Sequence, residues 1–422
     1  MFRLLAFSFA RLDSPSIRNI KTVSSIRPLR FARWGLLLNI FLLGACGDST
    51  DIKDFHNEIK IGILHSQTGT MAHSENSAIA GEILAIEEIN STGGITINNK
   101  RYRLNPIIRD GESDPEIFAL HAQQLVGEEQ LKVVFGGWTS SSRKAMLPTF
   151  ENHAALLFYP IQYEGFESAA NVFYFGATPS QQSIPALEWF RKQGWQDFFL
   201  IGSDYVYPRV ANNLFKQWIN KSHDTALRGE IYIPLNGRVD STVIDQIRES
   251  MPRGGVIVNT INGDSNESFF RQLRSHFLTD INGYQILSFS VDEALINQFG
   301  PKYLSGSYIS QGFLQDLDSK NAKQFVRKFR RRFGSKQPVP EPASTGYSMV
   351  KLWAHAVETV GSTNATLVAK ALIGMQFESP AGTLEISPNR HVSRVIRLGQ
   401  ILPNGQVTVI GDFGRIEPPD NN

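Results

Sequence analysis

The sequence predicts an α/β protein made of two lobes, each built on a doubly wound parallel sheet. From residue 58 onward, short β-branched segments alternate with longer amphipathic ones, the pattern of parallel strands joined by crossover helices. The chain has 422 residues, of which 41% are hydrophobic and 19% charged, enough for two domains with buried cores. No internal repeat or low-complexity segment changes that estimate.

The first half of this region alternates strands with helices. The first strand is predicted at 59–64, and the helix over 77–90 has apolar residues at helical spacing before Gly93-Gly94 ends it. Further strands are predicted at 104–109, 132–136 and 155–159, and further helices at 115–126 and 141–152.

The alternation begins again after Phe173-Tyr174-Phe175-Gly176. Helices are predicted at 183–193, 209–220, 241–249 and 265–276, and strands at 197–201, 229–233, 255–259 and 285–289. The last third is predicted to be more helical, with helices at 321–333 and 344–360. Two doubly wound halves therefore emerge from the pattern.

Residues 1–45 differ from the rest of the chain in charge. They carry seven Lys or Arg and one Asp, which leaves a net charge of −4 for residues 46–422. The main body thus has no basic excess to attract nucleic acid. The mostly apolar segment 34–45 is too short to span a bilayer. With its basic flank and small-residue exit, it predicts a signal peptide over 1–45.

The single cysteine, Cys46, excludes a disulfide framework, a Cys-based zinc site and a dithiol redox pair. A free cysteine is most often a small buried residue. Here a polar stretch follows it, which reads as a tether and not as a core strand. The sequence Leu43-Gly44-Ala45-Cys46 resembles a bacterial lipobox, and this resemblance implies that Cys46 is lipidated. Residues 46–57 then form a lipidated N-terminus and tether, and the protein is anchored to a membrane outside the cytoplasm.

Motifs of catalysis and of cofactor binding are absent from the sequence. It has no Walker A loop, no GxGxxG after a strand, no GxSxG and no HExxH, and its nine histidines lack ligand spacing. We therefore expect neither an enzyme nor a cofactor or metal site. Polar and aromatic residues instead follow four of the predicted strands. In open α/β sheets, ligands bind at this carboxyl end of the strands.

Several stretches resemble the type I periplasmic solute-binding proteins of ABC importers, in the branch that holds urea-binding and short-chain-amide-binding proteins. The resemblance extends over 59–418. The stretches that carry it are Ile61-Gly62-Ile63-Leu64-His65-Ser66, Gly137-Trp138-Thr139-Ser140, Leu157-Phe158-Tyr159-Pro160, Gln162-Tyr163-Glu164-Gly165, Gly202-Ser203-Asp204-Tyr205-Val206-Tyr207-Pro208-Arg209, Ile261-Asn262-Gly263-Asp264-Ser265-Asn266 and Gly399-Gln400-Ile401.

This resemblance implies the type I periplasmic-binding-protein fold, in which the chain crosses between the lobes three times. We place the crossings near Gly176, 304–310 and 397–400. Lobe 1 is then 58–176 plus 307–398, lobe 2 is 177–306 plus 399–416, and 417–422 is a tail. Such hinges allow the lobes to close around a ligand.

The resemblance also implies a ligand, urea or a short-chain amide, delivered to an ABC permease in the cytoplasmic membrane. Ser140 and Tyr205 are expected to meet the ligand's carbonyl, and Gln162 and Asp264 its amide nitrogens. Capping of the local helix is the alternative role for Ser140. Other candidate contacts are Trp138, Tyr159 and Tyr207, the first two as walls. Alternatives are an extracytoplasmic amide or urea sensor, an amidase and a branched-chain amino acid-binding protein.

Overall fold

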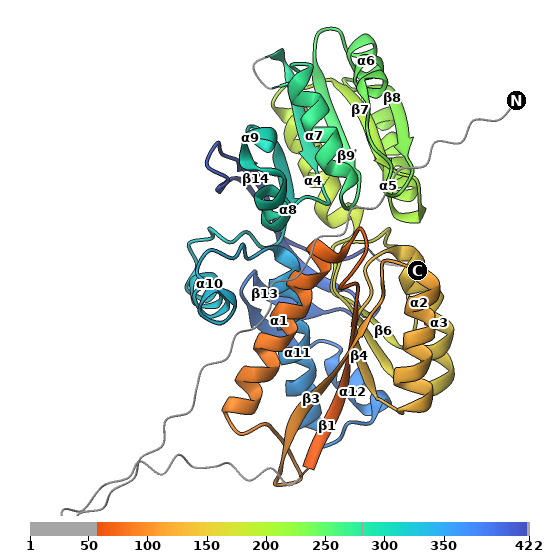
Figure 1. Cartoon of the computed structure of the whole chain (residues 1–422), viewed down its shortest axis with the longest axis vertical. Coiled ribbons are helices and arrows are strands. Elements are labelled where there is room, and N and C mark those ends of the chain that lie inside the picture. Colours follow the sequence, from red (N-terminus) through yellow and green to blue (C-terminus); the bar gives the residue numbers. More distant parts are fainter. Residues whose placement is uncertain (1–56, 280–281, 420–422) are drawn as a thin grey trace, which may run out of the picture. The chain divides into compact units, whose positions relative to one another are not determined.

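The computed structural model describes residues 57–279 and 282–419, which form two mixed, mainly parallel sheets covered by helices (Figure 1). The α/β prediction is therefore confirmed. The predicted signal peptide, Cys46 and most of the tether lie outside the described residues. None of the described helices is both long and apolar enough to cross a bilayer.

The first sheet has the strand order β2-β3-β1-β4-β5-β6. All neighbours are parallel except the β2–β3 pair. The strands are β1 (Asn57–His65), β2 (Ile95–Ile97), β3 (Lys100–Asp110), β4 (Val133–Gly136), β5 (Leu156–Tyr159) and β6 (Val172–Tyr174).

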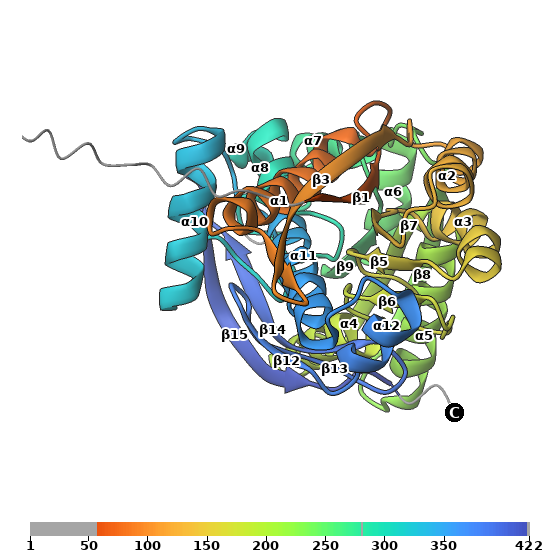
Figure 2. The ribbon, with the colours of Figure 1, turned by 90° about the horizontal axis from the view of Figure 1, so that it is seen from below.

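Side chains of β1 alternate between the two faces of this sheet, as a strand requires. Ile61 and Ile63 pack with α1 (Ala72–Ser91), α11 (Glu341–Val360) and α12 (Ala365–Leu372). Leu64 packs on the other face with α2 (Pro115–Ala122) and α3 (Ser140–His153). Figure 2 shows α1 and α11 on one side of the sheet and α2 and α3 on the other.

The second sheet has the order β12-β13-β14-β11-β10-β9-β7-β8, and β15 pairs with β14. Its parallel strands are β7 (Asp197–Ser203), β8 (Ala226–Ile233), β9 (Gly255–Thr260), β10 (Tyr284–Ser288) and β11 (Tyr308–Gln311). Its antiparallel strands are β12 (Gln376–Ser379), β13 (Gly382–Ile386), β14 (Val392–Ile401) and β15 (Val407–Ile416).

Helices cover both faces of the parallel part of this sheet. Phe198 and Leu200 pack with α4 (Pro179–Lys192) and α5 (Val206–Lys221). Phe199 and Ile201 pack with the helices on the opposite face. Those helices are α6 (Ser241–Ser250), α7 (Ser265–Ser275), α8 (Glu293–Phe299) and α9 (Pro301–Leu304). The doubly wound arrangement is thus present in both sheets, while α10 (Lys320–Phe333) packs through Phe325 and Phe329 in a separate cluster.

Several element boundaries differ from the prediction. Helix α1 begins at Ala72 instead of 77, and α4 begins at Pro179 instead of 183, because Thr178 and Gln181 form a capping box ahead of it. The predicted helix 115–126 is α2 followed by a π-helical turn, Gln123–Glu128. The last third was predicted to be more helical: α10 and α11 match its two predicted helices, but β12 to β15 follow α12 and were not predicted.

The C-terminal third contributes to both sheets. Helix α11 and residues Leu384 and Ile386 of β13 belong to the core of the first sheet. By contrast, β11 and β14 are hydrogen-bonded partners within the second sheet. The division of the chain into two lobes at three crossings stays a prediction.

Candidate ligand-binding site

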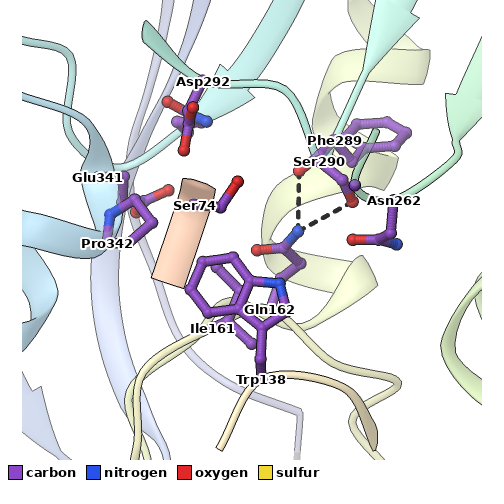
Figure 3. Close-up of a pocket in the computed structure, with 12 residues that line it drawn as sticks. Ser74, Trp138, Ile161, Gln162, Asn262, Phe289, Ser290, Asp292, Glu341 and Pro342 are labelled. Atoms are coloured by element: carbon purple, nitrogen blue, oxygen red, sulfur yellow. Dashed lines mark hydrogen bonds between the residues drawn. The ribbon is translucent and has the colours of Figure 1, made fainter. Parts of the chain in front are cut away.

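A small cavity lies where the carboxyl ends of parallel strands from the two sheets face each other (Figure 3). Its volume is about 20 Å³. A single water needs at least about 10 Å³ of such space, so the cavity suits a ligand of very few heavy atoms. The lining residues are Ser74, Trp138, Ile161, Gln162, Asn262, Gly263, Phe289, Ser290, Asp292, Gln311, Glu341 and Pro342.

Trp138 forms one wall, as the sequence predicts, and a glycine pair places it there. Gly136 ends β4 so close to β1 that a Cβ on it would lie 1.9 Å from the carbonyl oxygen of Leu64. Gly137 has φ +81°, a conformation that residues other than glycine rarely adopt. The chain therefore turns sharply after β4, and Trp138 reaches the cavity with 7% of its surface exposed.

Gln162 lies in the loop after β5 and bridges to the second sheet. Its Nε2 donates to the carbonyl oxygen of Phe289 and to Oγ of Ser290, each at 3.1 Å. Because the nitrogen is used in this way, Oε1 is left on the other side of the amide group, and Figure 3 shows it turned toward the side of the cavity where Ser74 lies. Gln162 is thus placed to accept a hydrogen bond from a ligand.

Behind this wall, Arg143 in the first turn of α3 links the segment after β4 to the loop after β5. The Arg143 guanidinium is fully buried, with Nη2 2.9 Å from Glu164 and Nε 2.9 Å from Glu167. Its carbon also lies 4.8 Å from the Tyr159 ring centre and 4.6 Å from that of Tyr163. Paired charges and two stacked rings make this a fixed base for both loops.

Ser140 and Tyr159 belong to this buried base and do not line the cavity. Ser140 Oγ donates to Glu164 Oε2 at 2.5 Å. The Tyr159 hydroxyl donates to the carbonyl oxygen of Trp138, and burial raises the Tyr159 pKa far above its ordinary value. Thr139, not Ser140, caps α3 by accepting from Ser142 N. Both predicted residues therefore sit one layer behind Trp138.

Tyr205 and Tyr207 are also placed outside the lining. Tyr207 is 2% exposed, and its hydroxyl has no hydrogen-bond partner within the described structure. Burial, together with the nearby Tyr159, raises the pKa of both Tyr205 and Tyr207. The two tyrosines are therefore neutral and adjoin the same buried base.

Asp264 faces solvent rather than the cavity. The chain leaves β9 and turns at Gly263, whose φ is +64°, so Asn262 and Gly263 line the cavity while Asp264 is exposed. The nearest partner recorded for Asp264 is Gln298 Nε2, 3.4 Å from Oδ1. The predicted loop thus contributes to the cavity through the residues just before the predicted one.

Six polar residues of the lining are not among the predicted contacts: Ser74, Asn262, Ser290, Asp292, Gln311 and Glu341. Ser290 and Asp292 follow β10, so the rule applied to the other strand exits would have found them. Gln311 ends β11, and Glu341 begins α11, which packs on the other sheet. No local pattern marks either of these two as a site residue.

The lining contains carboxylates but no Lys, Arg or His. Burial raises the pKa of Asp292 to about 6, against hydrogen bonds from the backbone of Leu295 that lower it. Burial also raises the pKa of Glu341, although Arg394 lies 3.2 Å away. The site is therefore matched to a neutral or positively charged ligand and not to an anion.

Among residues 57–279 and 282–419, no group of His, Cys, Asp and Glu is arranged to hold a metal ion. His65 forms a buried cluster with two glutamates. Its Nδ1 lies 3.3 Å from Glu75 Oε2, and its Nε2 lies 3.0 Å from Glu82 Oε1. Burial alone would lower the His65 pKa, but the two carboxylates outweigh it and raise the pKa to about 9. The two carboxylates therefore favour the imidazolium form of His65 at neutral pH.

The chain aligns with curated proteins over most of its length. It is 22% identical over 371 residues to Leu/Ile/Val-binding protein homolog 6 of Brucella abortus, which covers 86% of this chain and 91% of that protein. A local match, 30% over 111 residues, is to a protein named limonene hydroxylase from Geobacillus stearothermophilus; it covers 26% of this chain and 20% of that protein.

Solved structures share the fold. A solute-binding protein of an ABC transporter from Rhodopseudomonas palustris BisB5, in complex with 3,4-dihydroxybenzoic acid, has a TM-score of 0.78 at 20% identity and covers 86% of this chain and 99% of that chain. A branched-chain amino acid transporter substrate-binding protein from Streptococcus pneumoniae, in complex with isoleucine, has a TM-score of 0.72 at 18% identity and covers 86% and 100%.

These likenesses confirm the type I periplasmic-binding-protein fold. The family model described as a periplasmic binding protein domain matches residues 59–420. That match extends over both sheets and over every strand that contributes to the cavity. The chain therefore belongs to the periplasmic binding protein domain family.

Proposed function

We propose that the protein is an extracytoplasmic solute receptor of an ABC importer that binds urea or a short-chain amide between its two sheets. The observation that carries this proposal is the cavity itself: about 20 Å³, lined by amides, hydroxyls and carboxyl groups, with no basic side chain. Its size and its uncharged or acidic lining both favour a small ligand rich in N–H groups.

The hydrogen-bonding chemistry of the lining fits such a ligand. Urea offers one carbonyl acceptor and several N–H donors. Gln162 Oε1 and Gln311 Oε1 are acceptors for N–H groups, and the hydroxyl of Ser74 is available as a donor to the carbonyl. Trp138 closes one side with an apolar face that excludes water.

The ligands of related proteins have different requirements. Isoleucine and dihydroxybenzoate, found in two structures of the same fold, each carry a carboxylate. In this chain a ligand carboxylate would lie beside Asp292 and Glu341, and repulsion would oppose its entry. Binding of a branched-chain amino acid is the second candidate, because a relative is named as a Leu/Ile/Val-binding protein homolog. An acidic side chain of the lining would then receive the α-ammonium group.

Delivery to a permease is the proposed role of the bound receptor, with Cys46 as the site of lipid attachment. The bound ligand is released unchanged, so no catalytic step is involved. The alternative is a regulatory role, in which ligand binding reports urea or amide levels to a membrane partner. The partner protein that copurifies with the receptor distinguishes the two roles. Copurification with permease components supports transport, and copurification with a sensor kinase supports regulation.

Isothermal titration calorimetry on residues 47–422 tests the ligand assignment. Urea, acetamide, formamide, leucine and benzoate are titrated separately at pH 7.5. We expect heat from urea or an amide and none from leucine or benzoate. Binding of leucine or benzoate, with no response to urea or the amides, would overturn the proposal.

A further inference from the structure

Asp292 is a buried carboxylate at the cavity with no cation paired to it. The residue is 5% exposed and lines the cavity. Its Oδ1 accepts from Leu295 N at 3.0 Å and so caps the start of α8. No Lys, Arg or His of the described chain forms an ion pair with it. A buried, unneutralised carboxylate is costly, and a cationic ligand would offset that cost.

The charged and titratable groups around Asp292 do not neutralise it. Glu341 of α11 accepts from Gly312 N at 3.0 Å and pairs with Arg394 of β14 at 3.2 Å, so the Arg394 charge is already matched. His73 of α1 uses Nε2 to contact the carbonyl oxygen of Ala294 at 3.1 Å. Burial raises the pKa of Glu293 to about 8, which keeps that neighbour protonated and uncharged at neutral pH.

A second observation points to a ligand at the same place. Gln311 is 4% exposed and lines the cavity. Its Nε2 donates to the carbonyl oxygen of Val291 at 2.9 Å, while its Oε1 is buried and has no hydrogen-bond partner within the described structure. A buried acceptor without a donor carries a desolvation cost that a ligand N–H would remove.

We propose that the cavity takes a planar guanidinium or amidinium cation, whose N–H groups bind the carboxylate of Asp292 and Oε1 of Gln311. Guanidinium has the planar outline of urea but replaces the carbonyl acceptor with further N–H donors and a positive charge. This inference rests on the proposed function, because it assigns a charged member of the same size class to the same cavity. Charge-assisted hydrogen bonds to Asp292 distinguish it from the neutral ligand.

The ionisation of Asp292 makes the affinity for the cation depend on pH. Burial and the negative charge of Glu341 raise the Asp292 pKa to about 6, against the opposing effects of the α8 backbone and His73. Guanidinium stays charged throughout, like the arginine side chain. Its affinity is expected to rise by about tenfold from pH 5 to pH 7.5 as Asp292 ionises. Urea, which has no charge, is not expected to follow this rise.

The test titrates guanidinium chloride and urea separately, in the millimolar range at constant ionic strength, at pH 5 and pH 7.5. The variant is Asp292→Asn, because asparagine caps a helix as well as aspartate but has no charge. Asp240→Asn is the matched control: Asp240 caps α6 through the backbone of Thr242 and Val243 and does not line the cavity. Thermal unfolding checks that both variants are folded.

We expect wild type and Asp240→Asn to bind both ligands, and Asp292→Asn to lose about tenfold or more in guanidinium affinity together with its pH dependence. Asp292→Asn is expected to lose more affinity for guanidinium than for urea, because only guanidinium forms a charged bond to Asp292. Urea binding without guanidinium binding, or equal guanidinium affinity in wild type and Asp292→Asn, would overturn this inference alone. Absence of binding by urea, amides and guanidinium alike would reject the proposed function as well.

Discussion

Gln162 donates a hydrogen bond from Nε2 to Oγ of Ser290 across 3.1 Å, joining the loop after β5 to the loop after β10. The same nitrogen also reaches the carbonyl oxygen of Phe289. One side chain of the first sheet is therefore hydrogen-bonded to the second sheet beside the proposed ligand. The Gln162 nitrogen thus binds the opposite loop, and the Gln162 oxygen is free to accept a hydrogen bond from the proposed ligand.

We predict that Gln162→Ala weakens urea binding by about 10- to 100-fold, because both the contact to the opposite loop and the ligand acceptor are lost. Calorimetry measures the change. Gln193→Ala, at an exposed glutamine just after α4, is the control and should bind as wild type does. An unchanged affinity in Gln162→Ala would remove this residue from the site.

Arg143→Met is predicted to lower the free energy of unfolding by about 3–5 kcal/mol, because it leaves the buried Glu164 and the partly buried Glu167 with the half-exposed Lys144 as their remaining cationic partner. Arg143→Lys should recover only part of this, since lysine cannot bind two carboxylates through a planar fork. Thermal unfolding is the measurement, since chemical unfolding with urea would be confounded by binding. Arg209→Lys is the control, because its partner Asp204 is an exposed residue, and a loss as large as that of Arg143→Lys would contradict the assigned role.

Two buried histidines are predicted to have opposite charge states at pH 7. His65 has its pKa raised to about 9 by Glu82 and Glu75 despite burial, and burial lowers the pKa of His391 to about 4. Nitrogen chemical shifts of the rings should identify His65 as imidazolium and His391 as neutral. A neutral His65 at pH 7 would contradict the prediction.

The same pKa values set the sign of two stability effects. The His65 pKa lies above its unfolded value near 6.5, so its contribution is fully present below pH 6.5 and is lost as pH rises through about 9. The His391 pKa lies below that value, so its contribution is lost as pH falls toward about 4. The melting temperature should therefore fall on both sides of neutrality.

Cys46→Ser is predicted to move the protein from the membrane fraction to the soluble fraction. Stable attachment at this position requires more than one acyl chain, because a single chain gives only marginal binding. Fractionation followed by immunoblotting measures the distribution, and Ser49→Ala is the control in the same tether. An unchanged distribution would contradict the lipobox assignment.

The sequence was sufficient to predict those parts of the fold and cavity that local patterns determine. Alternating strands and helices are local, and Trp138 and Gln162 follow directly from strands β4 and β5. Asp264 lies outside the lining, because the chain turns at Gly263 and Asn262 lies at the cavity instead. Side-chain direction after a turn depends on backbone angles that residue type alone does not determine.

Other features depend on contacts between distant segments. Gln311 reaches the cavity because β11 pairs with β10 on one side and with β14 on the other. Glu341 reaches it because α11 packs beside α1. The separation of Ser140 and Tyr159 from the cavity follows from the ion pairs of Arg143, whose partners lie more than 20 residues away in sequence.

The position of Asp292, at once the cap of α8 and a wall of the cavity, constrains how the protein can evolve. Replacement by a residue that cannot cap would weaken the helix and alter the cavity together, so few residue types satisfy both roles. Aspartate and asparagine are both among them, and one nucleotide change converts their codons. If the cavity binds the ligands proposed above, a single mutational step at this position would change its preference between charged and neutral nitrogen compounds while the scaffold stays folded.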